Sequence, residues 1–554
     1  MTRFYLLSAV MLILLLSDFT HAQDDHQHHH DAGEKIGNVN FRTSCSPRVE
    51  TQFNRAVALL HSFGYELAEK AFSEILTTDP GCVMAYWGIA MTQNHPLWAP
   101  PTKAELMKGS AALEKAKPLS VGTQQERDYV AAVNAFYKDY ESVDHATRTM
   151  AYEKAMEQVF TRYPDDLEGA IFYSLSLLGT ASSRPVDKSF SKQKRAAEIL
   201  NGVLAKQPDH PGIAHYIIHS YDYPQLASLA LPAALSYAKI APSSPHALHM
   251  PTHIFTRLGL WPESIQSNQA SADAARRLVA KTHPGYGSFD QLHAMDYLAY
   301  AYLQGAQDHK AQQILDEMKT MDKLDDYVIA AAYSFAAVPA RLTLERRRWP
   351  DAARLTLYPT GFPWNRFPHA EAITWFTRAI GSARSGDAAS ARKNVERLDT
   401  LRQTLIASKD PYWPTQVEIQ KVTAEAWIAR AESRNGEALR IMRSAAELED
   451  STDKHPVTPG AVLPARELLG DMLLELGRPA EALREYETSL QTSPNRFGGL
   501  YGAGRAAELA NDRKKARDFY LKLTAMCEKA DGDRPELVHA KKFLARDAGP
   551  KRGK

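Results

Sequence analysis

The hydrophobic and polar positions of this chain repeat with helical spacing and with a longer period of about 34 residues. The longer period is clearest near the C-terminus. There a glycine, an alanine and a tyrosine recur one period apart, as Gly470, Ala482 and Tyr486 and then Gly504, Ala516 and Tyr520. No stretch of useful length alternates apolar and polar residues as a strand would. The pattern predicts an all-α chain of repeated helical hairpins.

Weaker copies of this spacing lie upstream. Their small, apolar and proline positions are Ala68, Phe72, Ile75 and Pro80; Ala196, Leu200, Val203 and Pro208; Gly259 and Ser264; and Gly386 and Ala391. We expect an N-terminal and central array over residues 48–350, degenerate helical repeats with aromatic loops over 351–459, and a C-terminal repeat pair over 460–545. Because each unit buries its apolar face only against its neighbours, the array should form one continuous core.

The C-terminal segments resemble the tetratricopeptide repeat (TPR). Their small residues let two helices approach closely, and Gly477 and Asn511 stand where the repeat turns between its helices. The resemblance implies a solenoid, a superhelix with a concave groove in which first-helix side chains grip ligands. The segments HPGIAHYIIH and HALHMPTHIF are similar to those of histidine-rich exported bacterial TPR proteins. That resemblance implies a fold and a compartment but no reaction.

The N-terminus has the organisation of a secretory signal. Arg3 precedes an apolar stretch over residues 6–16, and residues 20–22 (THA) form a small-x-small cleavage site. We expect residues 1–22 to be a cleaved signal peptide; the alternative is an uncleaved anchor helix. No later run of about 18 apolar residues follows, so no membrane span is expected after cleavage. The mature protein is therefore predicted to be periplasmic or secreted.

Residues 23–47 begin with a polar segment that lacks periodicity, which predicts a disordered tail. The histidines of this tail either capture divalent metal or only keep the segment solvated; they are His26, His28, His29 and His30. Three cysteines occur in the chain, Cys45, Cys82 and Cys527. Export permits a disulfide, and Cys45–Cys82 is favoured because both lie near the N-terminal end. The alternative is three unpaired or partly buried thiols.

Charge narrows the range of partners. Lys plus Arg number 66 against 65 Asp plus Glu, so neither nucleic acid nor an anionic membrane is expected as a partner. Catalytic sequence signatures such as HExxH, GxSxG and the phosphate-binding GxxxxGK[ST] loop are absent. The sequence does not decide whether the protein is an enzyme.

Histidine and aspartate gather in the middle of the chain, in the segments HPGIAHYIIHSYD, SPHALHMPTHIF and QLHAMDY. Two pairs, His215 with His219 and His249 with His253, have the i, i+4 spacing that places imidazoles one helical turn apart on one face. The candidate metal ligands are His215, His219, Asp222, His246, His249, His253, His293 and Asp296. Imidazole and carboxylate without thiolate suit zinc, iron, nickel or copper(II).

The TPR resemblance implies that these candidate ligands lie at groove-facing positions of three consecutive units. It also places residues of an earlier unit at equivalent positions: Trp87, Met91, Asn94 and His95. Residues near the cluster that would contact a small molecule or peptide in the groove are Tyr216, Arg257, Trp261 and Tyr297. The alternative is packing between helices and, for Arg257, ordinary surface charge.

Three hypotheses about function follow. The first is an exported solenoid with a His/Asp metal site in its groove, which binds a ligand or catalyses a metal-assisted reaction. The second is a metal-free scaffold that captures a peptide or helix of another exported protein. The third is metal storage or delivery, in which the histidine-rich tail loads the central site. A separate hypothesis is that residues 460–545 form an independent module that docks a partner without affecting the central site.

Overall fold

A computed structural model of the chain describes residues 34–97, 100–119, 122–183 and 187–547. The predicted signal peptide (residues 1–22) and the tail histidines (within residues 26–30) lie outside these described residues. Lys35–Lys554 form one compact unit. Its described residues are largely helical, with one isolated β-bridge between Gly287 and Leu324 and no strand.

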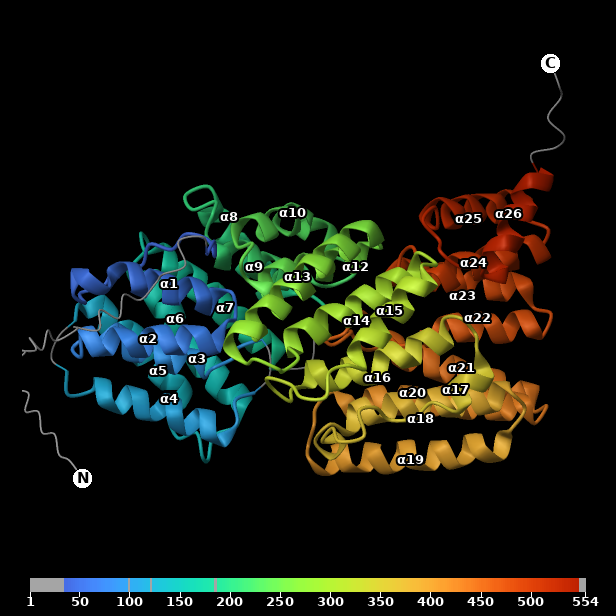
Figure 1. Cartoon of the computed structure of the whole chain (residues 1–554), viewed down its shortest axis with the longest axis horizontal. Coiled ribbons are helices and arrows are strands. Elements are labelled where there is room, and N and C mark those ends of the chain that lie inside the picture. Colours follow the sequence, from blue (N-terminus) through green and yellow to red (C-terminus); the bar gives the residue numbers. More distant parts are fainter. Residues whose placement is uncertain (1–33, 98–99, 120–121, 184–186, 548–554) are drawn as a thin grey trace, which may run out of the picture. The chain divides into compact units, whose positions relative to one another are not determined.

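Helices of different lengths follow one another through the first half of this unit (Figure 1). They are η1 (Pro47–Val49), α1 (Glu50–His61), α2 (Tyr65–Thr78), α3 (Val83–Thr92), α4 (Lys103–Ala116), α5 (Gln124–Tyr137), α6 (His145–Arg162), α7 (Leu167–Ser182), α8 (Ser191–Leu204), α9 (Pro211–Tyr221), η2 (Ala227–Ala230), α10 (Leu231–Ile240), α11 (Pro245–His249), α12 (Pro251–Leu258), α13 (Trp261–Thr282) and α14 (Phe289–Gln304).

The second half continues in the same way. Its helices are α15 (Asp308–Met318), α16 (Ile329–Leu344), α17 (Trp349–Ala353), η3 (Trp364–Arg366), α18 (Pro368–Arg384), α19 (Ala388–Ala407), α20 (Trp413–Ala431), α21 (Asn435–Asp450), α22 (Ala465–Glu475), α23 (Pro479–Thr492), α24 (Phe497–Leu509), α25 (Arg513–Met526) and α26 (Pro535–Asp547). Among the described residues, no helix combines the length and the apolar character needed to cross a membrane.

Each helix packs mainly against its neighbours in the chain. α18 packs on α19, α19 on α20 and α20 on α21, and α18 also reaches α20. The same succession of neighbours runs from α22 to α25, as Figure 1 shows. A stacked array of helical hairpins has this order of contacts. The predicted all-α solenoid is therefore confirmed.

Glycine makes room for tyrosine where the C-terminal helices cross. A Cβ on Gly470 would lie 2.7 Å from the Tyr486 ring, and one on Gly504 would lie 2.6 Å from the Tyr520 ring. Both tyrosines are fully buried. At the turn, Asn511 has a φ of 62°, the left-handed conformation that asparagine tolerates. The repeated residues thus serve close helix packing and tight turns.

The segment predicted as a disordered tail is ordered from Lys35 onward, which corrects that prediction. The Lys35 amide donates to Ser243 Oγ at 2.8 Å, and the Asn38 amide donates to the Asp209 carbonyl at 3.0 Å. Phe41 is 4% exposed and packs in an aromatic core. The physical reason is that the apolar side chains after residue 35 gain more by burial than a purely polar tail would.

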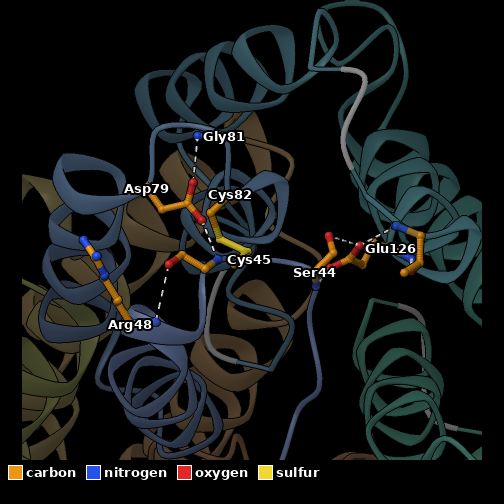
Figure 2. Close-up of a disulfide and its surroundings, with 9 residues drawn as sticks. Ser44, Cys45, Arg48, Asp79, Gly81, Cys82 and Glu126 are labelled. Atoms are coloured by element: carbon orange, nitrogen blue, oxygen red, sulfur yellow. Dashed lines mark hydrogen bonds between the residues drawn. A yellow bond between two sulfur atoms is a disulfide. The ribbon is translucent and has the colours of Figure 1, made fainter.

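A disulfide joins this N-terminal segment to the first repeats. Cys45 and Cys82, the pair that the sequence favoured, are bonded with a Cα–Cα distance of 4.8 Å (Figure 2). Asp79, beside the bond, accepts from the Gly81 amide, and Ser44 donates to Glu126 of α5. Cys527, the third cysteine, is buried as a free thiol.

Buried ion pairs join the C-terminal repeats to the central helices. Arg496 is 1% exposed and donates to Glu345 at 2.8 Å and to the Tyr300 hydroxyl at 2.7 Å. Arg534 ion-pairs with Asp308 at the start of α15. These contacts belong to one compact unit, so residues 460–545 pack against the central helices; independent partner docking by these residues stays a hypothesis.

Candidate metal centre

Six histidines from four neighbouring helices gather in two groups of three. The first histidine group comprises His215 and His219 of α9 with His246 of α11. The second histidine group comprises His249 of α11, His253 of α12 and His293 of α14. In each group, one potential ligand atom from every residue lies within 4.8 Å of the others. Contacts of α12 with α9 and of α11 with α14 bring these side chains together.

In the first group the imidazole nitrogens face one another. His215 Nε2 lies 3.1 Å from His219 Nε2 and 3.1 Å from His246 Nε2. On the other side of its ring, His215 Nδ1 lies 2.7 Å from the carbonyl oxygen of His61. A carbonyl oxygen only accepts, so Nδ1 carries the proton and the neutral ring has its lone pair on Nε2. The lone pair therefore points at the other two histidines.

Two rings of the second group are oriented in the same way. His249 Nε2 and His253 Nε2 lie 3.2 Å apart. His249 Nδ1 donates to Asn268 Oδ1 at 2.9 Å, and His253 Nδ1 donates to Asp222 Oδ2 at 3.0 Å. The Asn268 amide nitrogen donates to the Ser264 carbonyl, so the Asn268 amide oxygen is the atom that accepts from His249. Both Nε2 lone pairs consequently converge.

The two groups adjoin each other. The ring centroids of His219 and His253, one from each group, are 6.3 Å apart. α11 and α12 meet at Met250, which keeps helical dihedrals (φ −51°, ψ −36°) before Pro251. Because the chain stays helical through this junction, His253 remains about one turn beyond His249.

Burial decides the protonation of the cluster. His219 is half-buried, and the other five are buried: His215, His246, His249, His253 and His293. Burial is the main cause that lowers the pKa of all six imidazoles below the ordinary value. At neutral pH the rings are therefore uncharged, the form in which imidazole binds metal.

Asp222, one of the two predicted carboxylate ligands, has other partners. It accepts from His253 and also from Arg257 Nε at 2.9 Å and Lys454 Nζ at 3.0 Å. Burial by itself would raise the pKa of Asp222, but Lys454 and Arg257 outweigh burial and hold this pKa well below its usual range. The carboxylate thus lies behind His253 and orients its ring, outside the set of converging donors.

Asp296, the other predicted carboxylate, lies outside both histidine groups. It forms a buried ion pair with Arg341 and belongs to neither convergent set. Burial raises the pKa of Asp296 to about 6, against the opposing effect of Arg341. The sequence predicted that Asp222 and Asp296 bind metal together with the histidines. This prediction is corrected, because both carboxylates form ion pairs with nearby cations. The convergent donors are imidazoles alone.

The loop between α21 and α22 covers the second group. The Tyr297 hydroxyl hydrogen-bonds the carbonyl oxygens of Pro456 at 3.0 Å and Thr458 at 2.8 Å. Arg341 donates to the Gly460 carbonyl at 3.0 Å, and Lys454 of the same loop pairs with Asp222. Neither Lys454 nor this loop could be identified from the sequence, because no local spacing links residues so far apart in the chain.

Most residues predicted to contact a ligand in the groove are packing residues. Trp87, Met91 and Asn94 are at most 1% exposed, and Trp87 lies edge-on to Phe172 in the N-terminal aromatic core. The partly exposed His95 ring lies 4.5 Å from the Tyr65 ring. The prediction failed here because an apolar face of a first helix is filled by the neighbouring repeat.

Three predicted groove residues near the cluster, Tyr216, Trp261 and Tyr297, make hydrogen bonds or ring contacts within the fold instead. The Tyr216 hydroxyl hydrogen-bonds His61 Nδ1 at 2.9 Å, and Trp261 Nε1 donates to the Asn495 carbonyl at 2.8 Å. Tyr297 stacks on His253 with ring centroids 5.2 Å apart.

A cavity of about 380 Å³ lies behind Asp222, on the side of Arg257 and Lys454. Aromatic and cationic side chains share its lining, among them Trp261, Tyr333, Tyr412, Trp413 and Arg466. Of the predicted groove residues, only Arg257 and Trp261 line it.

A third buried group, His61, Glu168 and His210, has its hydrogen bonds satisfied internally. Glu168 accepts from His61 Nε2 at 3.0 Å and from His210 Nε2 at 2.8 Å. The other ring nitrogens are bonded to the Tyr216 hydroxyl and the Gly212 amide. No nitrogen of this group is left to bind a metal, and its role is to fix the His61 carbonyl that orients His215.

Comparison with known proteins bears on the fold only. No protein-family profile matches the chain, and no curated protein matches it. Among solved structures, it is similar to a tetratricopeptide repeat protein from Parabacteroides merdae, with a TM-score of 0.29 and 13% identity over 55% of this chain and 98% of that one.

Two further matches are the Cut9–Hcn1 hetero-tetramer of APC/C (TM-score 0.26, 12% identity, 90% of this chain and 95% of that one) and the TPR domain of P58(IPK) (TM-score 0.21, 15% identity, 70% and 100%). These TM-scores are too low for the matches to say anything about the histidine groups. The solenoid class follows from the order of helix contacts in this chain.

Proposed function

We propose that this helical-repeat protein binds transition-metal ions through its buried histidines. The observation that carries the proposal is the orientation of three imidazoles. His215, His249 and His253 each give Nδ1 to an oxygen acceptor and turn Nε2 toward another histidine. Metal-binding histidines are oriented in this way, by an oxygen acceptor on the second ring nitrogen.

The second histidine group gives the clearest reason for a bound ion. A buried polar nitrogen is costly unless it finds a partner, and the Nε2 lone pairs of His249 and His253 face each other at 3.2 Å while both Nδ1 atoms donate elsewhere. A metal ion offers both nitrogens a partner. Because the rings are neutral, the ion displaces few protons at neutral pH.

The donor set limits the ion to a few elements. Imidazoles without thiolate or carboxylate suit zinc, copper, nickel or iron. Three imidazoles leave a four-coordinate ion one open position, where water or a substrate binds. The same ligands would also serve metal storage or delivery, with the tail histidines supplying the ion.

The cavity of about 380 Å³ favours a second candidate function, the binding of a small molecule or peptide without metal. Its lining combines Tyr412 and Trp413 with Lys454 and Arg257, and also with the carboxyl side chains of Glu449, Asp450 and Asp453, so an aromatic group suits it. A protein partner at the C-terminal repeats is compatible with either function.

We further infer that the protein works outside the cytoplasm. Disulfides persist in oxidising compartments, and the Cys45–Cys82 bond agrees with the predicted signal peptide. The expected mature N-terminus is Gln23, which mass spectrometry of the exported protein would identify; recovery of the uncleaved chain in the cytoplasm would contradict this inference.

The experiment that tests metal binding uses the full chain with His26, His28, His29 and His30 replaced by Ala, so that only other sites can hold metal. Elemental analysis before and after reconstitution measures bound zinc, copper, nickel and iron. In the same background, the double substitution His249→Ala/His253→Ala should reduce bound metal while far-ultraviolet circular dichroism stays the same, because the repeats supply the core.

A matched control is His309→Ala, since this side chain is 77% exposed and lies outside both groups. It should leave the metal content unchanged. If the parent protein takes up no transition metal on reconstitution, the proposal is wrong and the metal-free function takes its place. Loss of helical structure in the double variant would instead assign these histidines a structural role.

A further inference from the structure

The two histidine groups are alike in composition and lie next to each other. Each offers three imidazoles within 4.8 Å, and at that spacing the six donors divide into two sets. The ring centroids of His219 and His253 are 6.3 Å apart across the boundary. Resting on the proposed metal-binding function, we propose that the cluster is a binuclear copper centre, with one Cu(I) ion in each group and dioxygen as the ligand that bridges them.

The number of ions follows from the geometry. An ion bonded to three imidazoles at about 2.0–2.1 Å requires nitrogens about 3–4 Å from one another, as the His215–His219 and His249–His253 nitrogen pairs are. The boundary between the groups falls within the continuous helical segment α11–α12, where His246 and His249 are one turn apart. Two ions held this way lie close enough for one small molecule to contact both.

The identity of the metal follows from charge. All six donors are neutral, and no carboxylate lies among them. The nearest carboxylate, Asp222, is shared by two cations, Arg257 and Lys454. Two divalent ions would therefore place four positive charges in a buried site without anionic ligands, which is costly. Di-iron and di-manganese sites use several glutamates to neutralise that charge.

Cu(I) meets these limits. Two Cu(I) ions carry two positive charges in total, and imidazole is a suitable ligand for copper. An ion with three nitrogen ligands would also keep a coordination position free for a small molecule.

Dioxygen suits the space and charge of such a pair. When O2 binds between the ions, each Cu(I) gives one electron, and O2 becomes peroxide bound to two Cu(II) ions. No further reductant is needed, and the two added positive charges are balanced by the two negative charges of peroxide. His219 is the one histidine of the six that is not buried.

The test uses the full chain with the four tail histidines replaced by Ala, loaded anaerobically from a Cu(I) donor buffered by a chelator. We expect two copper ions per chain, one for each group. After exposure to air the sample should gain a visible absorption band, which shows that the copper is oxidised, and still give no Cu(II) electron paramagnetic resonance (EPR) signal, because two bridged Cu(II) spins couple. Removal of oxygen should return the colourless Cu(I) form.

Single substitutions separate the two groups. His219→Ala in the first group and His249→Ala in the second should each leave one copper, which becomes EPR-visible after oxidation. Added imidazole should restore the second copper in His219→Ala, where the side chain is partly exposed and the gap is accessible. Circular dichroism checks that the variants fold, and His309→Ala is the control that keeps both ions.

The outcomes distinguish this inference from the proposed function. Two copper ions that gain a visible absorption band in air and still give no Cu(II) EPR signal support the inference. One copper per chain, two that stay colourless in air, or two that give the signal of isolated Cu(II), overturns the binuclear centre and leaves metal binding intact. No copper, together with no other transition metal, overturns both.

Discussion

At the scale of single residues, Asp222 does the most to hold the candidate site together. Its carboxylate orients His253 and binds Arg257 and Lys454, and the side chains of both cations are less than 10% exposed. We therefore expect the proposed metal affinity and the folding stability to depend on the same group. The two effects can be measured separately.

Replacing this carboxylate, as in Asp222→Asn, should leave Arg257 and Lys454 buried without a counter-charge. We expect a loss of about 3–5 kcal/mol in unfolding free energy, the usual cost of breaking a buried ion pair. Metal affinity should fall about 10–100-fold because His253 loses its anionic acceptor. Denaturant unfolding and metal titration measure the two effects. The control Asp273→Asn, in a surface pair with Arg276, should change neither.

The protonation of the histidines gives a second prediction. Burial lowers the pKa of His249 well below its ordinary value, so below about pH 6.5 the unfolded chain binds a proton that the folded chain refuses. The stability that neutral His249 contributes is thus complete above that pH and is lost as the pH falls. Asp296 and Glu449 work in the opposite direction, because burial raises their pKa values to about 6 and about 7.

A difference experiment isolates the histidine. In metal-free protein, His249→Gln should remove a pH slope of up to about 1.4 kcal/mol per pH unit between pH 6.5 and 5. Unfolding free energies of the parent, His249→Gln and His309→Gln across this range measure it. A constant difference between the parent and His249→Gln at all pH values would contradict the prediction.

The i, i+4 histidine pairs could be predicted from the sequence, because helical spacing fixes which side chains share a face. The partners of the two carboxylates could not be predicted from the sequence. Asp222 forms an ion pair with Lys454, 232 positions away, and Asp296 forms one with Arg341, 45 positions away. Long-range ion pairs leave no periodic trace in a single sequence.

At the scale of helices, the close crossing of glycine and tyrosine defines the hairpin. Gly504→Ala would place a Cβ 2.6 Å from the Tyr520 ring and should cost about 1–3 kcal/mol through overpacking. The matched control is Gly202→Ala in α8, where a Cβ meets nothing within 4 Å and the change should stabilise by about 0.4–1 kcal/mol. Urea unfolding of both variants measures the contrast; equal effects would mean that the crossing does not depend on glycine.

The hairpins near the C-terminus were predictable because their small residues and tyrosines keep a fixed period. The ordered start at residues 35–47 was not, because Phe41 lies outside any repeat and gains its stability from rings contributed by α1, α3 and α7. Trp87 was predicted to face the groove but is buried. The same position in the repeat faces a groove in one unit and is covered by the adjacent repeat in another.

At the scale of the whole molecule, Arg496 joins the C-terminal repeats to the centre through Glu345, Glu467 and Tyr300. Arg496→Met should leave two buried carboxylates without a cation and cost about 3–5 kcal/mol. Arg513→Met, in a surface pair with Asp547, is the control with little expected effect. Circular dichroism follows the unfolding of each variant and of the parent protein. Separate melting of the C-terminal repeats in the parent protein would contradict the prediction that Arg496 joins them to the centre.

The continuous core was predictable from the repeats, but the tie between the C-terminal repeats and the cluster was not. The loop that carries Lys454 reaches Asp222 only because α21 and α22 pack in the same unit as α9. Local patterns along a sequence predict neighbours within a repeat, and contacts between distant repeats depend on the path of the whole array.

The central claim, that the histidine cluster holds transition metal, is tested most directly by anomalous X-ray diffraction from crystals of the metal-loaded full chain. The account predicts an anomalous peak about 2.0–2.1 Å from Nε2 of His249 and His253, with His293 as the third ligand. A metal-loaded crystal whose anomalous peaks all lie away from His215, His219, His246, His249, His253 and His293 would contradict it.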